Sequence, residues 1–384
     1  MSKATAALAW NRSLIGKPGG RSELATPALV LDLDLFEANL QRMKDHCDAK
    51  GLALRPHAKT HKSAEIAKRQ IASGALGVCA AKLAEAEALA AGGVDAIHLT
   101  SAVVTDQGIS RVTQLNDVCR DFMMTVEDQS VAERLAKAAE KAGKPVQVII
   151  DIDVGLHRTG IRWGDDALAL TRWVAASPHL IYRGIQGYAG HVMHIEDFEE
   201  RKEASKGAMD LLKEARDGLA ADGLTPEIVT GGGTGTYNID SDLGVLTELQ
   251  AGSYLFMDRQ YNDVPLSNGQ PMPFETALMV QTTVISANTA GLATTDAGFK
   301  SFAADADAPQ ILSGAPEGAS YFFFGDEQGG ILLGSKETHL PLGSTLNCIT
   351  PHCDPTVNLY DVYHVVRGDT LVDIWDVTAR GCSQ

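Results

Sequence analysis

The chain has 384 residues, of which 45% are hydrophobic, and its formal net charge at pH 7 is −16. This length predicts a large α/β unit together with a smaller one. The acidic balance argues against nucleic acid or an anionic membrane as a partner, because both require a basic surface, but it leaves small anionic ligands open. Residues 1–12 lack a secretory pattern, no run of eighteen apolar residues occurs, and the six cysteines form no CxxC pair. We therefore expect a cytoplasmic protein with neither a membrane span nor a disulfide framework.

Short apolar runs alternate with longer amphipathic runs over the first two thirds of the chain, which is typical of βα units and a parallel sheet. After an early strand at 28–34, eight strands are expected at 52–57, 76–80, 96–101, 121–126, 146–152, 182–188, 227–230 and 248–256. Helical patterns lie between them at 63–73, 82–91, 130–142 and 198–222. Eight parallel strands close into a barrel, so the pattern predicts an α/β chain with a (β/α)8 TIM barrel.

After about residue 261 the pattern changes to strand-like runs, at 278–286, 291–296, 319–325, 345–348 and 362–367. These runs predict a second, C-terminal all-β domain that includes the N-terminal strand. The expected division is an N-terminal segment at 1–34 that contributes to the β domain, the barrel at 35–262, and the β domain at 263–384.

Lys59 follows the first barrel strand within the segment Leu-Arg-Pro-His-Ala-Lys-Thr-His-Lys-Ser at 54–63. Its neighbours His57, His61 and Lys62 are cationic or protonatable, and positive charge together with partial burial disfavours an ammonium group. We therefore expect a lowered pKa for Lys59 and a reactive amine, which suits a Schiff base with pyridoxal phosphate. A solvated basic turn is the alternative that this segment alone leaves open.

Other unusual residues also follow strands of the predicted barrel, at the end where barrel enzymes carry their chemistry. Arg158 lies in the loop after strand five, and Tyr188, His191 and His194 follow strand six. Glycine-rich runs at 230–236 and 250–253 come with strands seven and eight, whose loops commonly bind phosphate through exposed backbone N–H groups. A flexible surface turn is the alternative for either run taken alone.

A second motif, Thr-Pro-His-Cys-Asp-Pro-Thr-Val-Asn, occupies 350–358. On an extended segment His352 and Asp354 would point to one side and Cys353 to the other. An imidazole and a carboxylate on one face form half of a divalent-metal site. With a carboxylate as the second ligand, Mn²⁺ or Mg²⁺ becomes competitive with zinc.

Taken together, these motifs make the chain resemble the D-threonine aldolase and D-serine dehydratase family of pyridoxal-phosphate enzymes, which share the alanine-racemase fold type. The resemblance runs from about residue 26 to 381. It is carried by the segment around Lys59, the D-x-G-x-x-R-x-G phrase ending at Gly160, the GGGTG loop, ELQAGSYLFMD at 248–258, Asp-Ala-Gly at 296–298 and HCDPT at 352–356. Dehydratases resemble H-x-C at the metal pair and aldolases H-x-D, so His352 and Asp354 indicate the aldolase branch.

The resemblance implies an aldehyde-lyase that cleaves D-threonine, D-allo-threonine or D-phenylserine to glycine and an aldehyde. The first alternative is a 3-hydroxy-D-aspartate aldolase, which gives glycine and glyoxylate. The second is a dehydratase of D-serine or D-threo-3-hydroxyaspartate, against which Asp354 argues. A racemase would need two opposed bases and would leave the metal pair without a role. A pyridoxal-phosphate carrier would not need the β domain.

The resemblance also implies roles for individual residues. Lys59 forms the Schiff base, Arg158 bonds the phenolic oxygen of the cofactor, and His352 and Asp354 hold the metal, with Mn²⁺ expected before Mg²⁺, Co²⁺ or Zn²⁺. His194 and His61 are the candidate bases, with a metal-bound hydroxide as a third. A homodimer is the family expectation. The remaining cofactor contacts are expected from Gly233, Thr234, Gly235, Gly252 and Ser253 at the phosphate and from His57, Tyr188 and Gln250 beside it.

Two positions depart from the family pattern. Gln328 stands where the family usually has histidine, so the metal shell or the specificity could differ here. Arg259 and Gln260 follow Asp258 where close aldolases tend to carry a small residue and an acid. Two roles are open for Arg259: a partner for a substrate carboxylate, or a solvent or subunit contact.

Overall fold

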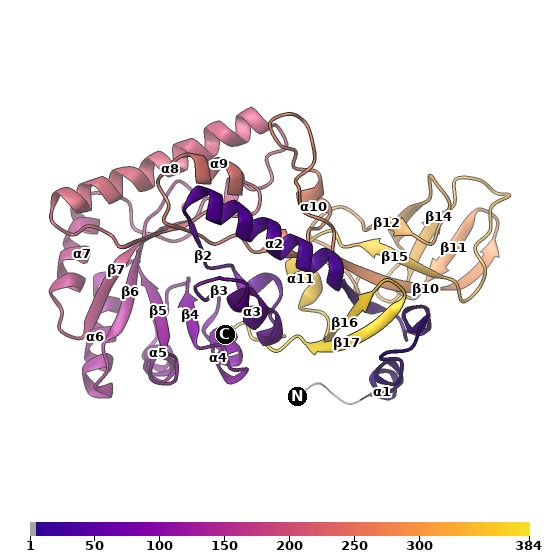
Figure 1. The fold of residues 1–384 in the computed structure, drawn as a ribbon, viewed down its shortest axis with the longest axis horizontal. Helices are drawn as coiled ribbons and strands as arrows, with labels where there is room; N and C mark the ends of the chain where they lie inside the picture. The colour runs from indigo at the N-terminus through magenta and orange to yellow at the C-terminus, as the bar shows by residue number, and fades with distance from the viewer. Residues whose placement is uncertain (1–4) are drawn as a thin grey trace.

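The computed structural model describes residues 5–384, so the first four residues of the predicted segment 1–34 lie outside the described residues. Figure 1 shows two lobes, with the barrel strands β2–β7 at one end and the strands β10–β17 at the other. The long helix α2 (Leu33–Lys50) crosses between them. None of the helices in the described part of the chain combines the length and the apolarity needed to cross a membrane.

The first lobe contains an eight-stranded parallel sheet in the order β2-β9-β8-β7-β6-β5-β4-β3. A parallel bridge between His57 and Cys79 joins its two end strands, so the predicted α/β barrel is confirmed. The strands are β2 (Ala53–Leu54), β3 (Val78–Ala80), β4 (Ala96–Leu99), β5 (Asp121–Val126), β6 (Val146–Asp151), β7 (Leu180–Gly187), β8 (Ile228–Gly231) and β9 (Glu248–Leu249).

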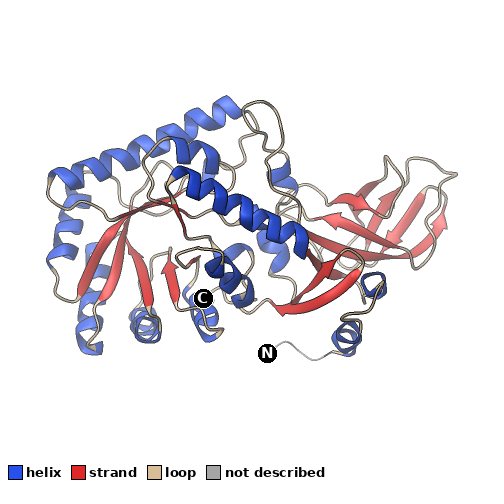
Figure 2. Ribbon diagram, viewed as in Figure 1, coloured by secondary structure: helices blue, strands red, loops and turns tan. Residues whose placement is uncertain are grey.

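Helices cover the outside of this sheet (Figure 2), because each carries one apolar face that packs on the strands. They are α3 (Ala64–Ala72), α4 (Leu83–Ala91), α5 (Asp106–Val118), α6 (Gln129–Ala142), α7 (Asp165–Ala176), α8 (Phe198–Ala221) and α9 (Tyr237–Asp242). The short helix α10 (Arg259–Asn262) lies between the two lobes (Figure 1). Four short 3₁₀ helices complete the connections: η1 (Gly20–Glu23), η2 (Ala58–Thr60), η3 (Gly190–Val192) and η4 (Ser253–Leu255).

The second lobe is the predicted all-β domain, and β1 (Ala28–Asp32) is part of it. β1 pairs antiparallel with β10 (Leu278–Thr289) and parallel with β16 (Val362–Arg367). The other strands of this sheet are β11 (Leu292–Thr295), β12 (Gln310–Ser313), β13 (Ser320–Phe323), β14 (Gly329–Leu332), β15 (Thr345–Ile349) and β17 (Thr370–Asp376). Helices α1 (Ala6–Ser13) and α11 (Cys353–Val357) also belong to segments of the chain that lie before and after the barrel strands.

Several predicted boundaries were wrong for local reasons. The first strand was expected to reach residue 34, but it ends at Asp32, whose carboxylate accepts bonds from Asp34 N and Leu35 N and so starts α2. The eighth barrel strand was expected to reach residue 256, yet β9 ends at Leu249. Strands β12, β14 and β17 were not predicted at all. In β14 the pair Gly329-Gly330 hides the strand pattern, since glycine has low strand propensity.

The C-terminal residues return to the barrel, where Gln384 O accepts a bond of 2.9 Å from Ala84 N in α4. Figure 1 accordingly places the C-terminus beside α3 and α4, while α1 lies by β17. Both ends of the chain thus pack on elements distant from them in sequence.

Candidate active site

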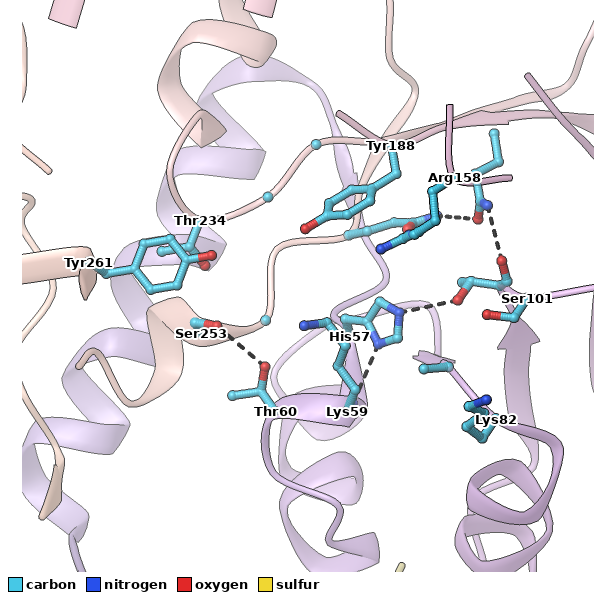
Figure 3. Close-up of a pocket in the computed structure, with 17 residues that line it drawn as sticks. His57, Lys59, Thr60, Lys82, Ser101, Arg158, Tyr188, Thr234, Ser253 and Tyr261 are labelled. Atoms are coloured by element: carbon cyan, nitrogen blue, oxygen red, sulfur yellow. Dashed lines mark hydrogen bonds between the residues drawn. The ribbon is translucent and has the colours of Figure 1, made fainter. Parts of the chain in front are cut away.

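A cavity of about 220 Å³ opens at the carboxyl ends of the barrel strands. Figure 3 shows Lys59 between its two ends, with Thr234 and Ser253 at one end and Ser101 and Lys82 at the other. The residues that line it come from almost every strand end: His57, Lys59, Thr60, Ala81, Lys82, Thr100, Ser101, Arg158, Gln186, Tyr188, Gly232, Gly233, Thr234, Gln250, Gly252, Ser253 and Tyr261. The structure therefore brings most of the predicted cofactor residues to one place.

Lys59 lies in η2, directly after β2, and its ammonium group donates a hydrogen bond to Asp354 of the β domain. Burial by itself lowers the pKa of Lys59, but the Asp354 carboxylate outweighs it and raises that pKa above its ordinary value. The predicted lowering was wrong, because it counted the cationic neighbours in sequence and not the carboxylate that the second domain supplies. The same pair holds the pKa of the buried Asp354 carboxyl well below its usual range, against the opposing effect of burial.

One end of the cavity is built from backbone without side chains. A Cβ atom at Gly233 would lie 2.6 Å from Met193 Sδ, and one at Gly252 would lie 2.7 Å from His57 O. The backbone contact excludes a side chain at Gly252, and at Gly233 the Met193 side chain would have to move, so glycine at both positions leaves the backbone N–H groups accessible to an anion. The Thr234 and Ser253 hydroxyls stand beside them (Figure 3). This end has the donor set that a phosphate group needs.

The middle of the cavity offers a flat and cationic wall. The Tyr188 ring faces it, and the Arg158 guanidinium lies 5.3 Å from the centre of that ring. A planar aromatic ligand can stack on such a ring, and the guanidinium can pair with an anionic oxygen on it. A glycine cradle, a lysine and a tyrosine wall together fit pyridoxal phosphate.

His57 is held as a neutral imidazole. Burial, and then the Lys59 charge, lower its pKa well below the ordinary value. Its Nδ1 accepts from Lys59 N at 3.4 Å, so the ring proton lies on Nε2, which donates to Thr100 Oγ1 at 3.2 Å. Behind it, Gln186 donates to Thr100 O at 3.2 Å and to an oxygen of the Asp151 carboxylate at 3.0 Å. A bonded polar layer thus supports the barrel side of the cavity.

His194 does not line this cavity, but its ring packs at a tilt of 45° against Tyr261, which does, with ring centres 4.6 Å apart. His194 is exposed overall, yet partial burial of its ring, followed by the charges of His352 and Lys59, lowers the pKa of His194 to about 4. It also lines a second cavity at the same edge, together with Arg259 and Pro351. His194 is therefore an unprotonated imidazole at neutral pH, next to the lysine and the metal motif.

Besides His194 and the two residues of the metal motif, two other predicted site residues lie outside this cavity. His61 is fully buried, accepts from Ser63 N and bonds Gln70 Oε1, both at 3.1 Å, so it supports the loop instead of facing a ligand. Gly235 is likewise absent from the lining. A Cβ there would lie 1.9 Å from Met193 O, so this glycine allows two backbone segments to pack.

The metal motif was expected to be extended, and this prediction was wrong. Cys353–Val357 instead forms helix α11, with His352 as its N-cap. Two contacts start the helix: Cys353 N donates to Asp258 Oδ2 at 2.7 Å, and the Thr356 hydroxyl donates to His352 O at 2.8 Å. Over the described residues 5–384, no three histidine, cysteine, aspartate or glutamate side chains group to hold a metal ion by themselves. His352 and Asp354 would thus give one nitrogen and one oxygen ligand, which leaves positions for water and substrate.

Sequence reasoning missed several residues at the site. Thr100, Ser101 and Gln186 stand at or just after strands β4 and β7, where barrel chemistry collects, so their position was the available signal. Tyr261 had no such signal. Gln328 is exposed in the β13–β14 hairpin and lines neither cavity.

Arg259 pairs within the chain. Its guanidinium bonds Ala308 O at 2.6 Å and Asp307 Oδ2 at 3.0 Å. Both expected roles, a partner for a substrate carboxylate or a contact with solvent or another subunit, stay predictions beside this internal contact.

Comparison with known proteins agrees with this geometry. Residues 31–260 match the model described as alanine racemase, N-terminal domain, and residues 277–366 match a putative serine dehydratase domain. The chain is 37% identical to 3-hydroxy-D-aspartate aldolase of Paracoccus denitrificans (strain Pd 1222) and 38% identical to D-threonine aldolase of an Arthrobacter species. Each alignment spans 94% of this chain and 93% of the relative. The chain belongs to the D-threonine aldolase and D-serine dehydratase family.

Solved structures in this family superpose on the whole molecule. The crystal structure of D-threonine aldolase from Filomicrobium marinum matches with a TM-score of 0.90 and 37% identity, over 94% of this chain and 97% of that one. D-threo-3-hydroxyaspartate dehydratase from Delftia sp. HT23 matches with a TM-score of 0.83 and 28% identity, over 93% and 98%. The predicted family and its alanine-racemase fold type are confirmed, and pyridoxal phosphate is the cofactor that the family supports.

Proposed function

We propose that the protein is an aldolase that uses pyridoxal phosphate and a divalent metal to cleave D-3-hydroxy-amino acids into glycine and an aldehyde. One contact carries this proposal: the Lys59 ammonium group, in the cofactor cavity, is bonded directly to Asp354 of the metal motif. The amine that would hold the cofactor and the carboxylate that would hold the metal therefore adjoin. The aldolase names of two relatives at 37% and 38% identity support the same reaction class.

For the cofactor, Lys59 would hold the aldehyde carbon, and Gly233, Thr234, Gly252 and Ser253 the phosphate. Tyr188 would face the ring. Arg158 and Gln250 would contact its edge. When bound, pyridoxal phosphate supplies an electron sink for the pair released as the Cα–Cβ bond breaks.

His352 and Asp354 would hold the divalent ion, which supplies positive charge beside the substrate 3-hydroxyl. An imidazole with a carboxylate favours Mn²⁺, with Mg²⁺, Co²⁺ and Zn²⁺ as alternatives. A solved structure of a mutant D-threo-3-hydroxyaspartate dehydratase, at 28% identity, is described as a metal-free form, which supports metal binding in that protein.

His194 is the residue that we assign as the base for the 3-hydroxyl proton. Its low pKa keeps the imidazole unprotonated at neutral pH, so a ring nitrogen can accept that proton as the Cα–Cβ bond breaks. The Tyr261 ring, which lines the cofactor cavity, packs against this imidazole. The buried His61 has both ring nitrogens engaged and is not proposed as the base.

The preferred substrate is one with an uncharged C3 substituent, such as D-threonine or D-phenylserine. Arg259, the arginine that lines the second cavity, already pairs with Asp307. A free cation is what a second substrate carboxylate would need. The second candidate function, 3-hydroxy-D-aspartate aldolase, is favoured by two relatives of that name, at 37% and 34% identity. We further propose a cytoplasmic homodimer, which is the expectation for this fold type.

The test is a product assay with purified protein, pyridoxal phosphate, Mn²⁺ and either D-threonine or 3-hydroxy-D-aspartate. Glycine with acetaldehyde supports the proposal. Glycine with glyoxylate as the faster reaction would select the second candidate. A 2-oxo acid with ammonia would place the protein with the dehydratases.

A further inference from the structure

One ring nitrogen of His352 is already engaged by the protein. Nδ1 lies 2.8 Å from Asp305 Oδ2. A carboxylate only accepts hydrogen bonds, so Nδ1 must carry the ring proton in this contact. A neutral imidazole protonated at Nδ1 has its lone pair on Nε2, and this is the nitrogen that remains to bind a metal ion.

We propose that Asp305 is a positioning residue for the metal site: it fixes the tautomer and the ring orientation of His352 in which Nε2 binds a divalent cation. This inference rests on the proposed function, because it concerns the same site. Histidines that bind metals commonly donate their other ring N–H to a carboxylate, which orients the ring and makes it a better ligand. Asp305 is not itself counted as a ligand, since no three-residue metal group occurs within residues 5–384.

The segment that carries Asp305 is tied to the metal motif on its N-terminal side. The hydroxyl of the buried Thr356 donates to His352 O at 2.8 Å and accepts from Ala303 N at 3.0 Å. One side chain in α11 thus joins the backbone of His352 to the backbone two residues before Asp305. The histidine and its carboxylate partner are held in register through this bridge.

Arg259 holds the same segment on its C-terminal side. Its guanidinium donates to Ala308 O at 2.6 Å and to Asp307 Oδ2 at 3.0 Å. The backbone N of Arg259 also donates to Thr350 O at 3.0 Å, just before the metal motif. Segment 303–308 is therefore fixed at both ends. Arg259, which departs from the family pattern, acts here on the loop that presents Asp305.

The ion pair between Asp305 and His352 is partly exposed, so it needs the support that segment 303–308 receives at its two ends. The Asp305 side chain is 51% exposed and the His352 side chain 23%. Water competes with an exposed ion pair, so the contact alone would hold the ring only weakly. Fixing the backbone on both sides reduces the freedom that the pair loses when it forms.

The experiment compares three variants of the enzyme loaded with pyridoxal phosphate. Asp305→Ala removes the acceptor, Asp305→Asn keeps an oxygen that can accept from Nδ1, and Asp263→Asn removes a charge from the second cavity without touching His352. Mn²⁺ affinity is measured by titration calorimetry. Before Mn²⁺ is added, ¹⁵N-histidine spectra give the tautomer of His352, with His352→Gln to assign its signals, and thermal melts check the fold.

We expect Asp305→Ala to weaken Mn²⁺ binding about tenfold, as loss of such partners does, and to shift His352 away from the Nδ1–H tautomer. Asp305→Asn should keep most of the affinity and the tautomer, and Asp263→Asn should match the wild type. The proposal is overturned if Asp305→Ala binds Mn²⁺ as tightly as the wild type with the tautomer unchanged. It is also overturned if Asp305→Asn or Asp263→Asn loses as much affinity as Asp305→Ala, because the effect would then be one of charge.

These outcomes separate the two proposals. An enzyme that binds Mn²⁺ and cleaves its substrate, but is indifferent to Asp305→Ala, overturns only the role of Asp305. A wild type that binds no more Mn²⁺ than His352→Gln overturns the metal part of the proposed function and this inference with it.

Discussion

Lys59 and Asp354 come from different lobes of the molecule and are joined by a hydrogen bond from the ammonium group to the carboxylate. The Asp354 side chain is 14% exposed and the Lys59 side chain 39%, so water screens the pair only in part. Each partner therefore shifts the pKa of the other, and the charge state of Lys59 depends on a residue 295 positions away.

Asp354→Ala should lower the pKa of Lys59, because burial then acts without the opposing carboxylate. More of the amine is neutral at pH 7, so the visible band of bound pyridoxal phosphate should appear faster than in the wild type. Stopped-flow spectra between pH 6 and 10 would measure this. Asp307→Asn, which removes a charge elsewhere, should leave the rates unchanged. An unchanged pH dependence in Asp354→Ala would contradict the role given to this carboxylate.

Lys59→Ala should abolish both the visible cofactor band and the release of glycine. No other lysine but Lys82 lines the cavity, and Lys82 lies at its far end (Figure 3). The absorbance spectrum after removal of free cofactor is the measurement. A band that persists in Lys59→Ala and disappears in the double variant with Lys82→Ala would move the attachment point to Lys82.

Gly252→Ala should weaken binding of pyridoxal phosphate, because the added Cβ would lie 2.7 Å from His57 O and 2.9 Å from Thr60 Oγ1. The backbone must shift, and the cradle loses its shape. Gly207→Ala is the control. It places a methyl group in open space on α8, where it should leave cofactor affinity unchanged and stabilise the helix by up to about 1 kcal/mol. Fluorescence titration gives the affinities. Equal cofactor affinity in the two variants would argue against the cradle.

His194→Gln and His61→Gln should fail in different ways. Loss of a proton acceptor at the reacting hydroxyl should reduce kcat by roughly 10²–10⁴-fold with little change in Tm. His61→Gln instead disturbs a buried network and should cost about 1–3 kcal/mol of stability, with kcat largely retained in the folded enzyme. Steady-state kinetics beside thermal melts would tell them apart. A reversed pattern would assign the base to His61.

Asp240 predicts how stability depends on pH. Burial raises the pKa of its carboxyl to about 6, against the hydrogen bonds from Ser205 and Thr236. Because the folded state holds this proton more tightly than the unfolded state, the group destabilises the fold above pH 6, and that cost disappears as the pH falls toward 4. The difference is about 3 kcal/mol. Asp240→Asn should therefore lose part of the gain in stability between pH 8 and pH 5. Urea unfolding at both values would show whether it does.

The fold could be predicted because its pattern is local: apolar strands, amphipathic helices and polar strand ends follow one another along the chain. Predicted strand boundaries were wrong where a side-chain contact decides them. At Asp32, for example, the side chain caps α2 and so ends the first strand. The prediction that the metal motif is extended was wrong for a similar reason. Asp258, which lies 95 positions before Cys353, accepts the bond that starts α11.

The site was predictable in its residue types but not in its electrostatics. The sequence predicts Lys59, Arg158 and the glycine loops as site residues because they follow strands of the barrel. The pKa of Lys59 shifts upward where the sequence predicted a downward shift, because Asp354, which bonds the amine, is distant from it in sequence. Asp305 gave no signal at all, because nothing in a loop of alanines and aspartates tells which carboxylate meets His352.

β1 lies between β10 and β16, with Val30 opposite both Met279 and His364. During synthesis the barrel strands are complete before either neighbour of β1 exists, so β1 must wait, with one or both edges unpaired, until the last part of the chain is made. The carboxylate that holds Lys59 arrives with that last part. The amine therefore gains its counter-ion only when the C-terminal part of the β domain has been made, which makes closure of that domain the step that completes the candidate active site.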